Sequence, residues 1–75
     1  MTVHVKLLGD FGENLDRSHC LSIQGSVTIN TIIRELGVEN AGSAIVLVNG
    51  SGCNNRDAAL NDGDTVTFLP FIDGG

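Results

Sequence analysis

Hydrophobic residues at the start of the chain alternate with polar ones. Val3, Val5 and Leu7 are each separated by one polar residue, and this period of two is typical of a strand with one buried face. We therefore expect a first strand over residues 2–8. His4 would lie on its outer face, where a solvent-exposed histidine is expected rather than a metal ligand.

A segment rich in glycine and polar residues follows and is expected to form a long link to a second strand. Phe11 and Leu15 are its apolar residues and could pin the link to the core. Leu21 and Ile23 then recur with a period of two and predict a shorter second strand over residues 19–23.

The next segment has a helical period. We expect a helix within residues 27–37, with Thr28 as its N-cap and Gly37 at its C-terminal end. Its β-branched residues lower the intrinsic helix propensity, so its stability should come from packing on a sheet. The apolar residues at i, i+3, i+4 and i+7 are Ile29, Ile32, Ile33 and Leu36.

Two further strands are expected in the second half of the chain. Residues 44–48 are apolar on both faces and end in an Asn-Gly turn signal. A strand buried on both sides would be unusual in so small a domain, so its outer face is expected to be an exposed patch for a partner. Residues 51–59 indicate a polar loop with at most a weak edge strand or helical turn, and alternation over residues 65–69, with Phe68 inward, predicts the last strand.

The order strand, strand, helix, strand, strand predicts an α+β fold, a mixed sheet of four or five strands with one helix packed across it. This is the layout of the β-grasp, or ubiquitin-like, fold, in which the last strand runs parallel to the first at the centre of the sheet. No repeat or linker divides the 75 residues. We therefore expect one domain over residues 1–69 and an extended tail over residues 70–75.

Size and charge limit the classes of function. A chain of 75 residues builds a small core and leaves little room for a pocket lined by several catalytic side chains, so an autonomous enzyme is not expected. The net charge of -5 disfavours nucleic acids and anionic membranes as partners. It favours a partner with a basic docking surface, although the same charge would also keep a small domain soluble.

The sequence has no candidate membrane span and no signal-peptide pattern, so we expect a cytoplasmic protein. Cys20 and Cys53 are too few for an iron–sulfur cluster or a four-cysteine zinc site, and too far apart for a CxxC redox pair. They are expected to be reduced structural thiols. We expect no resident metal or cofactor.

The last six residues are the candidate chemical site. Pro70 lacks a backbone donor, so the last strand should stop there or lie at an edge of the sheet. Phe71 and Ile72 are apolar residues beyond the core that could bind a partner's groove. Gly74 and Gly75 would let a terminal carboxylate pass through a channel too narrow for a β-carbon. Two final glycines alone are a weak signal, because a chain with ten glycines would end this way by chance in about two cases in a hundred. The combination of these features is more specific.

The carboxylate of Gly75 would need activation before it could react. A carboxylate is a poor electrophile, so acyl transfer requires that a leaving group be installed first. ATP can supply it as an acyl-adenylate, and sulfide or a persulfide sulfur can then displace AMP and leave a thiocarboxylate. The carrier would supply position and its enzymes would supply catalysis.

The ending DGDTVTFLPFIDGG, from Asp62 to Gly75, and the preceding Val48-Asn49-Gly50 carry a family likeness. The sequence resembles the MoaD/ThiS family of ubiquitin-like sulfur carriers, which share a DGD, a hydrophobic strand, a proline and a terminal GG. The resemblance implies adenylation of Gly75 by an activating enzyme related to those of ubiquitin, with ATP used by that enzyme. Loading by sulfide or a persulfide protein would follow. The residues implied in partner binding are Leu69, Pro70, Phe71, Ile72 and Asp73, with Gly74 and Gly75 at the reacting end.

Within that family, the long link between the first two strands and Leu69-Pro70 are more similar to the small subunit of molybdopterin synthase. This implies the large synthase subunit as sulfur acceptor, in molybdenum cofactor biosynthesis. Phe71 stands where many small subunits have a second proline, and Asp73 stands where a small neutral residue is usual. A carrier for thiamine or cysteine biosynthesis, a ubiquitin-like modifier forming isopeptide bonds through Gly75, and an interaction domain with an inert tail therefore stay open.

Overall fold

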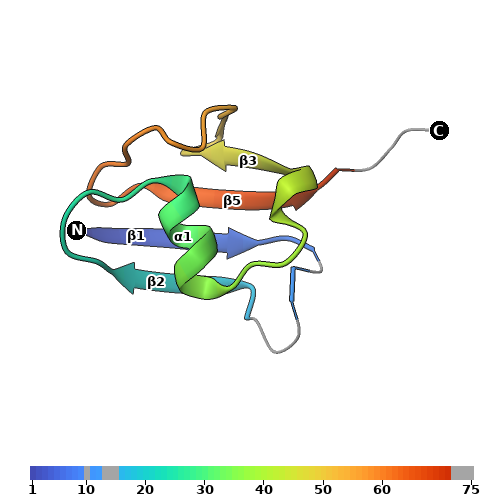
Figure 1. The fold of residues 1–75 in the computed structure, drawn as a ribbon, viewed down its shortest axis with the longest axis horizontal. Coiled ribbons are helices and arrows are strands. Elements are labelled where there is room, and N and C mark those ends of the chain that lie inside the picture. Colours follow the sequence, from blue (N-terminus) through green and yellow to red (C-terminus); the bar gives the residue numbers. More distant parts are fainter. Residues whose placement is uncertain (10, 13–15, 72–75) are drawn as a thin grey trace.

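The computed structural model of the protein describes residues 1–9, 11–12 and 16–71. They form a five-stranded sheet with one α-helix packed across it (Figure 1). The elements, in chain order, are β1 (Thr2–Leu7), β2 (Ser18–Ser22), α1 (Ile29–Leu36), the 3-10 turn η1 (Ala41–Ser43), β3 (Ala44–Val48), β4 (Ser51–Gly52) and β5 (Thr65–Pro70).

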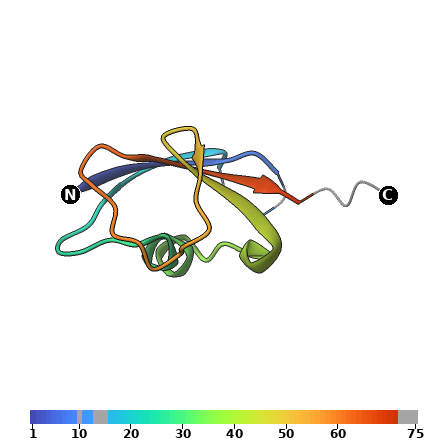
Figure 2. The ribbon, with the colours of Figure 1, turned by 90° about the horizontal axis from the view of Figure 1, so that it is seen from above.

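The strand order in the sheet is β2-β1-β5-β3-β4. β1 and β5 are parallel neighbours at the centre, and the other pairs are antiparallel. The helical elements α1 and η1 lie on one side of the sheet (Figure 2), and in the described part of the chain no helix covers the opposite side. This arrangement is the β-grasp fold, and it confirms the fold class predicted from the order of elements.

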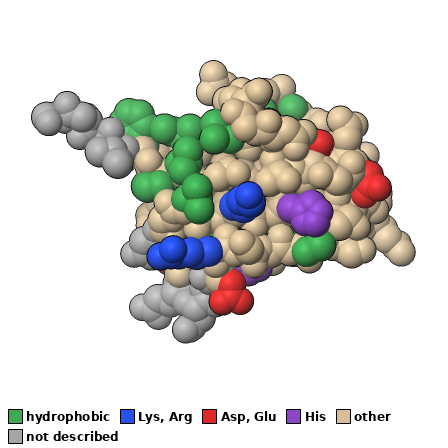
Figure 3. Space-filling view, turned by 180° about the vertical axis from the view of Figure 1, so that it is seen from behind, with side chains coloured by type: hydrophobic (Ala, Val, Ile, Leu, Met, Phe, Trp, Pro, Cys, Tyr) green, Lys and Arg blue, Asp and Glu red, His purple; other side chains and the backbone are tan. Residues whose placement is uncertain are grey.

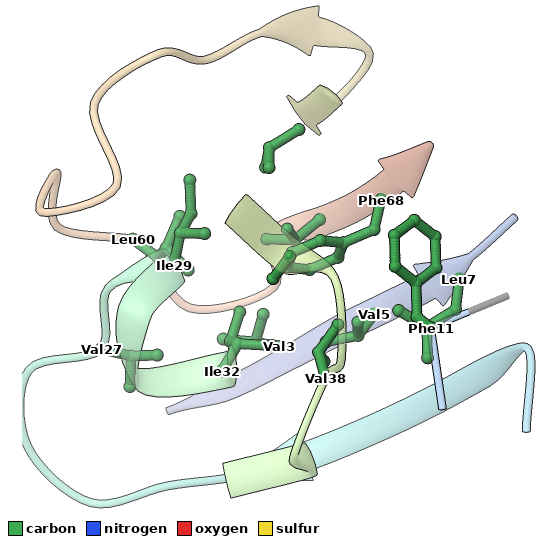
Figure 4. Close-up of a cluster of buried hydrophobic side chains, with 13 residues drawn as sticks. Val3, Val5, Leu7, Phe11, Val27, Ile29, Ile32, Val38, Leu60 and Phe68 are labelled. Carbon is green, nitrogen blue, oxygen red and sulfur yellow. The ribbon is translucent and has the colours of Figure 1, made fainter. Parts of the chain in front are cut away.

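Alternate residues of the central strands supply the core beneath α1. Val3, Val5 and Leu7 of β1 and Val66 and Phe68 of β5 are buried at every second position, as the period of two predicts, while Pro70 at the end of β5 is exposed. Each large apolar side chain buried in this way contributes about 1.5–3 kcal/mol to stability. The buried apolar residues are Val3, Val5, Leu7, Phe11, Val27, Ile29, Ile32, Val38, Ala41, Val46, Leu60, Val66 and Phe68 (Figure 4).

Both ends of α1 are capped as the sequence predicts. The Thr28 hydroxyl accepts a hydrogen bond from the Thr31 backbone N–H at 3.2 Å, and the Thr31 hydroxyl accepts one from the Thr28 N–H at 3.1 Å. Gly37 ends the helix in the left-handed conformation, with φ 66° and ψ 43°. Ile29 and Ile32 are buried against the sheet.

The strand boundaries differ from the sequence predictions by one residue. β1 ends at Leu7 and β2 begins and ends one residue early, while β5 extends to Pro70. Pro70 is accommodated because it is the last residue of β5, where a missing N–H interrupts no later pairing. Phe11 is buried as predicted, and Leu15 lies outside the described residues.

Arg56 joins the loop before β5 to the turn before β3, a role that the sequence pattern does not predict. Its guanidinium donates hydrogen bonds to the carbonyl oxygens of Ala41 and Ala44, the second at 3.1 Å. The same loop is tied to α1, because Asn30 Nδ2 donates to Asp57 Oδ1 at 2.7 Å. These contacts hold η1 and the start of β3 against the rest of the domain.

Candidate functional site

The candidate site begins where β5 ends. β5 is paired on both sides: Leu7 of β1 is opposite Phe68, and Ala44 of β3 is opposite Pro70. The Leu8 N–H donates to the Phe68 carbonyl at 2.9 Å, which extends the contact with β1 by one residue. The strand that leads to the tail is therefore held at its last residues by both neighbours.

Phe68 anchors this end of β5 in the core. Its side chain is fully buried and meets the Phe11 ring edge to face, with ring centroids 6.1 Å apart and an interplanar angle of 64°. Phe11, in the link between β1 and β2, is thereby packed against β5.

The predicted partner-binding residues fall into two groups. Leu69 is half-buried, Pro70 is exposed, and Phe71 is 64% exposed, so the structure brings these three together at one end of the sheet. The remaining site residues lie outside the described residues: Ile72, Asp73, Gly74 and Gly75.

Apolar side chains gather on the side of the sheet opposite α1, next to the end of β5 (Figure 3). Leu8 is 50% exposed and Ile45 is 41% exposed, and Ile45 is directly opposite Leu69 in the β3–β5 register. This confirms the predicted exposed patch on the outer side of β3. We call the patch the apolar face; its residues are Leu8, Ile45, Leu47, Leu69 and Phe71.

Charge is distributed unevenly over this side of the sheet. Lys6 alternates with the buried residues of β1 and so lies on the outer side, opposite Thr67 of β5. Figure 3 shows Lys or Arg side chains next to the apolar patch, and a histidine farther along the same face. Asp62 and Asp64 lie in the turn before β5, at the other end of that strand from Phe71. The apolar face therefore has cationic rather than acidic neighbours within the sheet.

Two motifs that carry the family likeness meet in that turn. Asn49 Nδ2 donates to Asp64 Oδ1 at 2.9 Å, and the Thr65 N–H donates to Asn49 Oδ1 at 2.9 Å. Asn49 and Gly63 have positive φ angles of 52° and 86°, which Asn and Gly adopt most readily. The VNG and DGD sequences therefore build the junction between β3 and β5 rather than a reactive site.

The hydrogen bonds of this junction affect the ionisation of Asp64. The backbone N–H of Asn61 donates to Asp64 Oδ2 at 2.8 Å, and the Asn49 side chain donates to Oδ1. Hydrogen bonds to the ionised carboxylate, first from Asn61 and then from Asn49, lower the pKa of Asp64 below its ordinary value of 3.8.

The cysteines and histidines form no metal-binding cluster within the described ranges. Those residues contain no group of three His, Cys, Asp or Glu side chains that could hold an ion. Cys20 is exposed, and the Cys53 thiol donates to the Asn55 carbonyl at 3.5 Å. His4 is exposed as predicted, and His19 Nε2 lies 2.8 Å from the Asp16 carbonyl oxygen. Among these residues no helix is long and apolar enough to cross a bilayer.

Comparison with known families decides the relationship. The family model described as the ThiS family matches residues 5–75. The chain belongs to the ThiS family. Members of this ubiquitin-like group are small sulfur carrier proteins rather than enzymes, which confirms both the resemblance found in the sequence and the expectation that the chain is not an enzyme.

Solved structures share the fold of this ThiS-family chain. One is the complex of subunits 1 and 2 of molybdopterin-converting factor from Helicobacter pylori, with a TM-score of 0.71 and 20% identity over 100% of both chains. SAMP1 from Haloferax volcanii has a TM-score of 0.72 and 18% identity over 100% of both chains. ThiS from Geobacter metallireducens has a TM-score of 0.63 and 23% identity, covering 96% of this chain and 99% of that one. At these identities the likeness shows the fold alone.

No curated protein sequence matches this ThiS-family chain closely enough to count as a relative.

Proposed function

We propose that the Gly75 carboxylate carries sulfur. An activating enzyme would join it to AMP from ATP, with release of pyrophosphate. Sulfide would then attack the acyl carbon, so that a C–S bond forms and the C–O bond to AMP breaks. With a persulfide donor, a further thiol would be needed to cleave the acyl disulfide and release the thiocarboxylate. The match of the ThiS family model through residue 75 is the observation that carries this proposal.

The packing and pairing of β5 support the proposal. The buried apolar side chains pack against one another and include Val66 and Phe68 of β5, whose last residues are paired on both sides. The domain therefore holds the strand that precedes the tail in a fixed position, while the enzymes that bind the carrier supply the catalytic groups. ATP would be bound by the activating enzyme, in the cytoplasm, and the carrier itself would need no cofactor.

The apolar face is the surface proposed to dock on the activating enzyme. It is continuous with the predicted binding residues, because Leu69 and Phe71 belong to both. An exposed apolar side chain next to a reactive tail contributes binding energy without needing to reach the reacting atoms.

The test is the chemical state of Gly75. Co-expression with the cognate activating enzyme and a sulfur donor should give a product in which sulfur replaces one oxygen, located by fragmentation mass spectrometry at Gly75. Deleting Gly75 should abolish the modification without changing the fold. Recovery of carboxylate alone after incubation with that enzyme, ATP and sulfide would rule out the proposed chemistry.

For the sulfur acceptor, we propose the large subunit of molybdopterin synthase. The support is the likeness, over the full length of both chains, to a subunit of the Helicobacter pylori molybdopterin-converting factor, together with the long link between β1 and β2. A thiazole synthase is the second candidate, favoured by the match to the ThiS family model. Thiocarboxylated protein incubated with each synthase together with its small-molecule substrate should pass its sulfur to that substrate and return to the carboxylate only with the true synthase. Covalent high-mass adducts that disappear on deletion of Gly75 would instead indicate a protein modifier.

A further inference from the structure

Pro70, the last residue of β5, lies against Gly9, which follows β1 by two residues. A β-carbon built on Gly9 would be 2.9 Å from Pro70 Cδ and 3.1 Å from Pro70 Cγ, and 3.2 Å from Phe11 Cε2. Non-bonded carbon atoms are most stable at about 3.5–4.0 Å. A side chain at position 9 would therefore collide with the proline ring.

Position 9 requires glycine because there is no room for a side chain. Four other described glycines adopt positive φ angles between 66° and 86° with nothing near the missing side chain. Gly9 has no such φ, so any residue could adopt its backbone conformation. Gly42 and Gly52 have neither a positive φ nor an atom within 4 Å of a built β-carbon. What distinguishes Gly9 from these glycines is the close approach of Pro70.

The opposite side of Pro70 is also occupied. Pro70 is the partner of Ala44 in the β3–β5 register, and the Ala44 carbonyl accepts a hydrogen bond from Arg56. The proline ring fixes φ near about −65°, so it cannot turn aside as a flexible side chain would. A displacement of the ring must move the backbone of Pro70 and of Phe71, the residue that follows it.

We propose that Gly9 is a positioning residue that sets the direction in which the chain leaves β5. By having no side chain, Gly9 lets the Pro70 ring lie between Gly9 and Ala44, and this contact sets the orientation of Phe71. The inference rests on the proposed function, because the direction matters to a reaction only if Gly75 must reach an activating enzyme. It adds a determinant of reaction rate that lies outside both the tail and the apolar face.

The kinetic test compares G9A with G42A, a matched control that adds the same methyl group to open space. In pyrophosphate exchange with the cognate activating enzyme, G9A should lower kcat about tenfold, since small misplacements of reacting groups have large effects on rate. KM should rise by less than kcat falls, because only Phe71 of the docking residues is reoriented and the rest of the apolar face is retained. G42A should match the wild type. A rise in KM alone, or the same loss of kcat in G42A, would overturn the inference.

A double substitution separates positioning from general damage. P70A removes Cγ and Cδ, the proline atoms that the new methyl group would strike. The kcat of G9A/P70A should therefore be within about twofold of the kcat of P70A. The kcat of G9A should be about tenfold below that of the wild type. If G9A fails to fold, G9A/P70A should fold. An equal loss in both backgrounds, or an unfolded double variant, would contradict the role given to Gly9.

An NMR measurement on the carrier alone tests the geometry without any enzyme. The wild type should show nuclear Overhauser contacts between the Gly9 α-protons and the Pro70 δ-protons. In G9A, residual dipolar couplings should report a reoriented Phe71 N–H, with no such change in G42A. An unchanged Phe71 orientation would overturn the inference. If no activating enzyme adenylates the wild type, the proposed function fails, and this measurement still decides whether Gly9 sets the exit direction.

Discussion

Asp64 stabilises the turn into β5 through the charge that it carries. Its carboxylate accepts hydrogen bonds from the Asn61 backbone and the Asn49 side chain, and these lower its pKa in the folded state. The unfolded chain therefore binds the Asp64 proton more tightly than the folded protein does. The ionised group stabilises the fold above about pH 3.8, and this contribution is lost as the pH falls below that value.

Replacing Asp64 with Asn should remove this part of the pH dependence. We expect the free energy of unfolding of D64N to fall less steeply than that of the wild type between pH 5 and about pH 3. Urea titrations at several pH values would measure the difference. E35Q, which removes one acid from the exposed side of α1, should keep the wild-type slope. Parallel slopes for D64N and the wild type would show that the hydrogen bonds to Asp64 do not favour its ionised form.

Residues whose roles are local could be predicted from the sequence. Thr28 and Gly37 act on the helix turns next to them, so their spacing was enough to place both caps. The pairing of Asn49 with Asp64 and the approach of Gly9 to Pro70 join residues that are distant along the chain. Such contacts depend on the strand register and on which strands are neighbours, which period and composition do not specify.

At the level of elements, Arg56 connects η1 and β3 to the loop before β5. Both of its acceptors are backbone carbonyls, those of Ala41 and Ala44, and hydrogen bonds from a charged donor stabilise more than neutral ones. This connection explains how a stretch with so little regular structure stays packed. It could not be read from the sequence, where Arg56 is one polar residue among several in a loop.

We expect R56M to lower the free energy of unfolding by about 2 kcal/mol, because two carbonyls lose a charged donor while the apolar stem is retained. Denaturant unfolding at neutral pH would measure the change. R34M removes the same charge from an exposed position on α1 and should differ from the wild type by less than about 0.5 kcal/mol. Equal losses in the two variants would mean that net charge, rather than the clamp on the two carbonyls, sets the stability.

At the level of the whole molecule, net charge and local charge differ. The total of -5 predicts a partner with a basic surface, and that prediction treats the charge as if it were spread evenly. The fold places Asp62 and Asp64 at one end of β5 and the apolar face at the other, with Lys6 on the same side of the sheet. Composition could not reveal this arrangement, because it results from the strand order. The apolar face itself could be predicted, because the sequence of β3 is apolar on both sides.

The apolar face should contribute to binding without contributing much to stability. Phe71 is 64% exposed and lies beyond β5, so F71D should leave the melting temperature close to that of the wild type. The same substitution should weaken binding to the activating enzyme about tenfold, because a charge replaces an exposed aromatic anchor. Calorimetric titration would give the dissociation constant. Q24D adds the same charge at an exposed position after β2, near the start of β1, and should bind like the wild type. Equal weakening in F71D and Q24D would mean that net charge causes the effect. An unchanged dissociation constant for F71D would show that Phe71 is not part of the docking surface.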